Sequence, residues 1–133
     1  MNSGNTKTPP ADNLSASTSS CAKAPSHARG AAPGLVSFVG AGPGDPELLT
    51  LKGRKAIEEA SLVLYAGSLV PPDVVACAAP GVPVVDSAPL TLEQCHDLVR
   101  RTALAGGPVA RVHTGDPSLY GALREQARLL DQD

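Results

Sequence analysis

Two short segments of the chain combine glycine with aspartate and proline, residue types that together can shape a ligand site. The first is G-A-G-P-G-D-P at residues 40–46, and the second is G-D-P at residues 115–117. Each follows an apolar run typical of a buried β-strand and contains an aspartate that can cap a helix, with proline at the first helical position. In a parallel sheet both segments would lie at the carboxyl ends of their strands, where open α/β sheets bind ligands.

The acidic residue in the first segment indicates which ligand can bind there. Asp45 occupies the helix N-terminus at which a phosphate would otherwise bind, and its carboxylate repels an anion. The glycine spacing G-x-G-x-G also differs from the dinucleotide fingerprint G-x-G-x-x-G, and no Lys-Ser or Lys-Thr pair follows as a P-loop requires. Two such segments facing one crevice suit a ligand with hydroxyl groups and a positive charge. The alternative is a tight turn from strand to helix that binds nothing.

The elements that position these segments alternate between strand and helix. We expect strands over residues 36–39, 61–65, 82–86 and 109–113, and helices over residues 46–60, 73–79, 91–105 and 117–130. The first helix would bury Leu48, Leu49 and Ile57, while Thr91 and Gln94 form a capping box at the start of the third. This order predicts an α/β fold with a largely parallel sheet and helices on both faces.

Length and composition argue against several classes of function. The 133 residues carry a formal net charge of −2 with one phenylalanine and two tyrosines, which argues against nucleic-acid binding. No apolar run approaches the roughly 20 residues of a membrane-spanning helix. Three cysteines without a C-x-x-C pair fit a reducing cytoplasm. No metal site is expected, because Cys95 and His96 are adjacent on a helix and their side chains point about 100° apart.

Residues 1–34 differ in composition from the rest of the chain. They are rich in Ser, Thr, Pro, Ala and Asn, and Leu14 is their only large aliphatic side chain after the initiating methionine. Such a segment buries too little apolar surface to offset the entropy of ordering, so we expect a disordered extension. Residues 35–133 are expected to form one α/β domain.

Three stretches of sequence together resemble the tetrapyrrole methyltransferases. They are V-G-A-G-P-G-D-P-E-L-L-T-L-K-G at residues 39–53, Y-A-G-S-L-V-P-P at residues 65–72 and R-V-H-T-G-D-P-S-L-Y-G-A-L-R-E-Q at residues 111–126. The first stretch is shared across that family, whereas the other two resemble the members that methylate precorrin-4 or cobalt-precorrin-4 at carbon 11. A uroporphyrinogen-III or precorrin-3 methyltransferase is the alternative within the family, and a non-catalytic ligand-binding half-domain is the alternative outside it.

The resemblance implies both a reaction and a set of contacts. The reaction is transfer of a methyl group from S-adenosylmethionine to carbon 11 of precorrin-4, which gives precorrin-5 in cobalamin biosynthesis. In similar enzymes the adenosyl ligand lies between two α/β domains, of which residues 35–133 match the first. The residues that match its contacts are Pro43, Thr114, Gly115, Asp116 and Leu119. By the same analogy the tetrapyrrole faces Tyr65, Ala66, Gly67 and Ser68.

Individual side chains have little chemistry to perform, because a sulfonium is already an activated methyl donor and the enzyme mainly orients the reactants. His113 is the candidate general base, and the alternative is a hydrogen-bonded histidine behind the site. The resemblance also implies a homodimer. Members of the family continue well beyond the position that matches Asp133, so we expect the chain to be an incomplete fragment that does not turn over alone.

Overall fold

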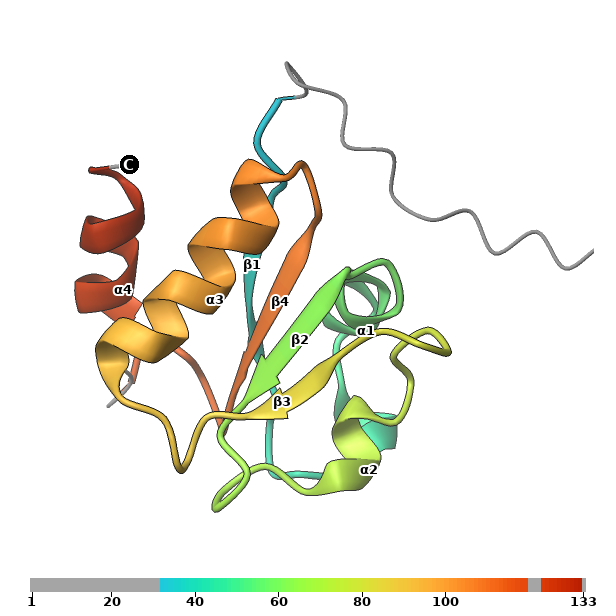
Figure 1. Ribbon diagram of the computed structural model, residues 1–133. Helices are drawn as coiled ribbons and strands as arrows, with labels where there is room; N and C mark the ends of the chain where they lie inside the picture. Colours follow the sequence, from blue (N-terminus) through green and yellow to red (C-terminus); the bar gives the residue numbers. More distant parts are fainter. Residues whose placement is uncertain (1–31, 120–122, 133) are drawn as a thin grey trace, which may run out of the picture.

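Four parallel strands form one sheet at the centre of the computed structural model, which describes residues 32–119 and 123–132 (Figure 1). The strands are β1 (Val36–Gly40), β2 (Leu62–Tyr65), β3 (Val84–Asp86) and β4 (Val109–His113). Their spatial order is β1-β4-β2-β3, so β4 lies between β1 and β2. The predicted parallel α/β fold is confirmed, and the carboxyl ends of these strands meet at one edge. Residues 1–31 of the expected extension lie outside the described residues.

One face of the sheet is covered by α1 (Leu51–Glu58) and α2 (Pro72–Val75), as Figure 1 shows. Ile57 of α1 and Val74 of α2 are fully buried in a cluster that includes Val112 of β4. Because successive residues of a strand point to opposite faces, this cluster takes alternate residues of β2 and β4, Val63 and Tyr65 from the one and Ala110 and Val112 from the other.

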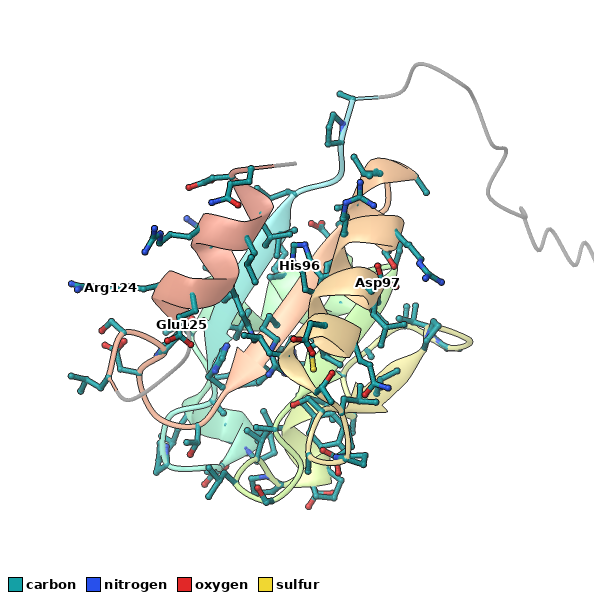
Figure 2. All side chains as sticks on the ribbon, turned by 60° about the vertical axis from the view of Figure 1, so that its left-hand side comes forward. His96, Asp97, Arg124 and Glu125 are labelled. Carbon is teal, nitrogen blue, oxygen red and sulfur yellow. The ribbon has the colours of Figure 1, made fainter. Side chains whose placement is uncertain are left out.

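The opposite face is covered by α3 (Leu92–Leu104) and α4 (Leu123–Leu130), which lie side by side (Figure 1). Cys95 and Val99 of α3 are buried against this face in a second apolar cluster. Figure 2 shows His96 on the side of α3 that is nearest to α4. Helices therefore cover both faces, as predicted.

The sequence predicts the start of α3 correctly and predicts α2 and α4 only in part. The predicted capping box of α3 is confirmed, since the Gln94 N–H donates to Thr91 Oγ1 at 3.2 Å and the Thr91 N–H donates to Gln94 Oε1 at 2.9 Å. The helix expected over residues 73–79 is too long, because the backbone after Val75 makes tighter turns before Pro80. Residues 117–119 form a turn where a helix is expected, and residues 120–122 lie outside the described part. No helix in that part is long and apolar enough to cross a bilayer.

The prediction of one continuous helix over residues 46–60 is wrong. Pro46–Leu48 form a single 3-10 turn, and α1 begins only after Thr50. Leu49 and Thr50 have extended backbone, with ψ of 139° and 146°, and Thr50 Oγ1 accepts a backbone N–H of the first turn of α1 at 3.0 Å. A threonine that captures a backbone N–H competes with helix continuation. The break leaves Leu48 60% exposed instead of buried.

Candidate functional site

Two loops that follow neighbouring strands are joined at the carboxyl edge of the sheet. The first loop, residues 40–46, begins at the last residue of β1, and the second loop, residues 114–119, follows β4. The Gly115 N–H donates to the Gly42 carbonyl oxygen at 3.1 Å, and the Gly42 N–H donates to the Gly115 carbonyl oxygen at 3.3 Å. Both residues have positive φ angles, 59° at Gly42 and 58° at Gly115, a conformation that favours glycine. The two segments thus meet as a parallel sheet predicts.

Gly40 is needed for a different reason, which is the close approach of the loops. A Cβ atom at this position would lie 2.5 Å from the Gly115 carbonyl oxygen and 3.0 Å from the ring of Pro117. Backbone atoms cannot move aside as a flexible side chain can. Any side chain at Gly40 would therefore push the two loops apart.

Each loop uses its aspartate to cap its own backbone. Asp45 Oδ1 accepts the Glu47 N–H at 2.9 Å. Asp116 Oδ1 accepts the Ser118 N–H at 2.8 Å and the Ser118 hydroxyl at 2.7 Å, and these bonds hold the pKa of Asp116 below its usual range. Asp116 is therefore an exposed anion at neutral pH, and its Oδ2 has no hydrogen-bond partner among the described residues.

A groove of about 530 Å³ lies between the two loops. Its volume is within the range of about 300–1,000 Å³ that is usual for small-molecule sites. The residues that line it are Phe38, Gly40, Gly42, Leu48, Thr50, Gly115, Asp116 and Pro117. Asp116 is the charged group among the described residues that line it, and none of these is a lysine or arginine, so the groove favours a ligand with a positive charge or hydroxyl donors. Within the described residues, no three His, Cys, Asp or Glu side chains gather as metal ligands.

The five residues matched to cofactor contacts all lie on the two joined loops. Gly115 and Asp116 line the groove, whereas Pro43, Thr114 and Leu119 are exposed on the loops beside it. Leu119 is 64% exposed, and its N–H donates to the Asp116 carbonyl oxygen at 3.0 Å.

Three residues that line the groove lie outside the two segments that the sequence analysis singled out, residues 40–46 and 115–117. They are Phe38, Leu48 and Thr50. The break before α1 brings Leu48 and Thr50 to the groove, so the signal that could have found them is a threonine able to cap a second helix start.

His113 lies behind the groove and not in its lining. Its side chain is 8% exposed and stacks on Phe38, with ring centroids 6.0 Å apart and planes at 28°. Burial, and next the charge of Arg111, lower the pKa of His113 to about 4. Its Nε2 has no hydrogen-bond partner among the described residues. The imidazole is therefore neutral at pH 7 and a weak proton acceptor.

A third loop, residues 65–71, contains the positions expected to face the tetrapyrrole. Tyr65, Ala66 and Gly67 are half-buried and Ser68 is exposed. A Cβ atom on Gly44 would lie 3.1 Å from the ring of Pro71, so the third loop touches the first.

Asp86, the last residue of β3, and Ser87, which follows it, hold the start of the third loop. The Tyr65 carbonyl oxygen accepts the Ser87 N–H at 2.8 Å and the Ser87 hydroxyl at 3.0 Å. The Gly67 N–H donates to Asp86 Oδ1 at 2.8 Å. Neither Asp86 nor Ser87 is among the predicted site residues, although both come at the end of a predicted strand. Polar residues at the carboxyl end of a strand are the signal that could have found them.

Comparison with known proteins agrees with the sequence resemblance. The family model of the Tetrapyrrole (Corrin/Porphyrin) Methylases matches residues 35–133. Precorrin-4 C(11)-methyltransferase of Mycobacterium tuberculosis is 50% identical over 99 residues, which are 72% of this chain and 38% of that protein. The chain thus spans less than half the length of this relative.

Two solved structures share the fold. The X-ray structure of a cobalamin biosynthetic enzyme, cobalt precorrin-4 methyltransferase, gives a TM-score of 0.70 at 45% identity, covering 73% of this chain and 41% of that one. Uroporphyrin-III C-methyl transferase from Thermus thermophilus, complexed with S-adenyl homocysteine, gives a TM-score of 0.62 at 43% identity, covering 74% of this chain and 40% of that one. With residues 35–133 matched and the fold shared, this chain belongs to the tetrapyrrole (corrin/porphyrin) methylase family.

Proposed function

We propose that residues 35–133 form an α/β domain of a methyltransferase that acts on carbon 11 of precorrin-4 or cobalt-precorrin-4 and gives precorrin-5 in cobalamin biosynthesis. The methyl donor in this proposal is S-adenosylmethionine. The names of the matched relatives support the substrate. The observation that carries the proposal is the pairing of Gly42 with Gly115, because it joins the two loops beside a groove that Asp116 lines.

The groove fits a positively charged ligand that carries hydroxyl groups. Its glycine lining leaves room for a ligand against the backbone, and the Asp116 carboxylate can accept hydrogen bonds through Oδ2. When bound there, S-adenosylmethionine supplies a methyl group already activated by its sulfonium. The residues that would hold it are Pro43, Thr114, Gly115, Asp116 and Leu119.

The chain's own residues would act by orientation and by exclusion of water. Holding two reactants in line can contribute about 7 to 11 kcal/mol to catalysis. The third loop, with Tyr65, Ala66, Gly67 and Ser68, would face the tetrapyrrole from the same edge of the sheet. His113 fits poorly as a general base, because its pKa of about 4 makes it a weak proton acceptor at neutral pH. We therefore assign no proton transfer to it.

A chimera tests the proposal. Residues 35–133 of this chain would replace the matching segment of the Mycobacterium tuberculosis relative, and methyl transfer to precorrin-4 and to cobalt-precorrin-4 would be followed under anaerobic conditions. We expect methylation at carbon 11, weakened by Asp116→Asn and unaffected by the matched variant Asp45→Asn. A folded chimera that binds S-adenosylhomocysteine but methylates neither precorrin would contradict the substrate assignment.

A cytoplasmic homodimer is the remaining part of the proposal. Cys77 and Cys95 are free thiols, which fits a reducing compartment. Sedimentation of the chimera would measure its assembly, and a monomer at micromolar concentration would contradict the homodimer.

A further inference from the structure

A buried arginine holds the segment to which the third loop is attached. Arg111 lies in the middle of β4, is 7% exposed, and donates from Nη1 to Ser87 Oγ at 2.9 Å. The Ser87 hydroxyl in turn donates to the Tyr65 carbonyl oxygen at 3.0 Å. A guanidinium only donates, so its bond to Oγ leaves the single hydroxyl proton for the Tyr65 carbonyl. Arg111 therefore orients a hydroxyl that anchors the start of the third loop.

Burial of the charged Arg111 side chain costs free energy, so packing alone does not explain why an arginine lies here. Desolvation lowers the pKa of the guanidinium, and its Nε has no hydrogen-bond partner among the described residues. No carboxylate in that part of the chain forms an ion pair with it. An apolar side chain of similar volume would avoid the cost of burying an unpaired charge. The bond to Ser87 is the polar contact that accounts for an arginine here.

Asp86 anchors the same loop a second time. Its Oδ1 accepts the Gly67 N–H and the Ala88 N–H, each at 2.8 Å. Gly67 packs directly on this carboxylate, and a Cβ atom there would overlap it. Because β3 has three residues and lies at an edge of the described sheet, few strand hydrogen bonds hold the segment that follows it. The hydrogen bond from Arg111, on a strand inside the sheet, to Ser87 attaches this segment a further time.

We propose that Arg111 is a positioning residue for the third loop and acts through Ser87. The inference rests on the proposed function, in which this loop faces the tetrapyrrole. Arg111 acts on the backbone of Tyr65 through Ser87, and on that of Gly67 through Asp86, the neighbour of Ser87. It does not line the groove between the first two loops, so it does not act on the adenosyl ligand. A loop ordered before the substrate arrives loses less conformational entropy on binding.

Amide hydrogen exchange of the full chain tests the positioning step. We expect Arg111→Met and Ser87→Ala to speed exchange of the Gly67 amide on the order of tenfold, because the segment that holds Asp86 loosens. Ser87→Thr keeps the hydroxyl and restores slow exchange. The matched control is Arg101→Met, an exposed arginine of α3 that pairs with Asp97, and it leaves Gly67 unchanged.

Unchanged exchange of Gly67 in Ser87→Ala would overturn the proposal. Ser87 is only half-buried, so this variant decides the outcome even where Arg111→Met fails to fold. Circular dichroism of each variant identifies such a failure.

Titrations with precorrin-4 and with S-adenosylhomocysteine separate this proposal from the proposed function. Ser87→Ala is expected to raise the Kd for precorrin-4 on the order of tenfold and to leave the Kd for S-adenosylhomocysteine unchanged. Equal weakening of both ligands would contradict a role specific to the third loop. An unaltered chain that binds neither ligand would count against the proposed function, while the exchange rates would still decide whether Arg111 positions the loop.

Discussion

The first and second loops share the tripeptide Gly-Asp-Pro and the same cap, yet their carboxylates face different surroundings. In each loop the aspartate Oδ1 accepts the N–H two residues further on, from Glu47 in the first and Ser118 in the second. Asp45 then starts a 3-10 turn and lies outside the groove lining. Asp116 lines the groove and receives an additional bond from the Ser118 hydroxyl. The tripeptide therefore sets the cap, and its surroundings decide whether the carboxylate faces the groove.

The strands that lead into the two loops differ as well. Gly40 at the end of β1 is the register partner of His113 at the end of β4. One position has no side chain because the loops approach closely there, and the other carries a buried imidazole. The two strand ends thus make opposite contributions, since one permits contact between the loops and the other fills the space behind them.

Gly40→Ala should have the largest effect on the contact between the loops. We expect a loss of about 3 kcal/mol in the free energy of unfolding, because the new Cβ overlaps backbone and not a flexible side chain. The matched control is Gly81→Ala, where φ is +83° and no atom lies within 4 Å, so only backbone strain of about 1 kcal/mol applies. Urea denaturation measures both. Equal losses in the two variants would show that the close approach does not matter.

His113 should make stability depend on pH. Its pKa is about 4 in the folded chain, below the ordinary value of about 6.5, so the unfolded chain binds more protons between these values. The free energy of unfolding therefore falls as the pH drops through this window, by up to about 3 kcal/mol. His113→Gln removes that part of the slope. Denaturation curves with the same slope in both proteins would contradict the burial of a neutral imidazole.

Ser118→Ala should have the smallest effect and should be confined to the second loop. Loss of the hydroxyl bond raises the pKa of Asp116 toward its ordinary value, while the bond from the backbone N–H remains. Ser118→Thr keeps a hydroxyl and should keep the lowered pKa. Titration of the Asp116 carboxyl by NMR measures the shift, and an unchanged pKa in Ser118→Ala would exclude the hydroxyl as its main cause.

The fold follows from local signals in the sequence. Apolar runs, glycine turns and the Thr91–Gln94 capping box each act within a few residues, so the order of strands and helices was predictable. The break before α1 was not predictable, because the helical pattern across it looks continuous. The competing signal is one side chain, that of Thr50. Phe38, Leu48 and Thr50 were missed in the groove partly for that reason.

The attachment of the third loop depends on tertiary neighbours. Arg111 and Ser87 are 24 residues apart in sequence and come together only because β4 lies inside the sheet and β3 at its edge. No local pattern encodes that pairing. Gly115 and Asp116 were predictable as groove residues because their loop follows a strand directly, which fixes their place at the carboxyl edge.

Calorimetric titration with S-adenosylhomocysteine tests most directly whether the aspartate of the second loop, and not that of the first, binds the adenosyl ligand. Asparagine caps a helix about as well as aspartate, so Asp116→Asn and Asp45→Asn differ from the unaltered chain mainly in charge. We predict that Asp116→Asn weakens binding on the order of tenfold, because a charge-assisted hydrogen bond is lost, and that Asp45→Asn leaves binding unchanged. Equal weakening by the two variants, or no weakening by Asp116→Asn, would contradict the account.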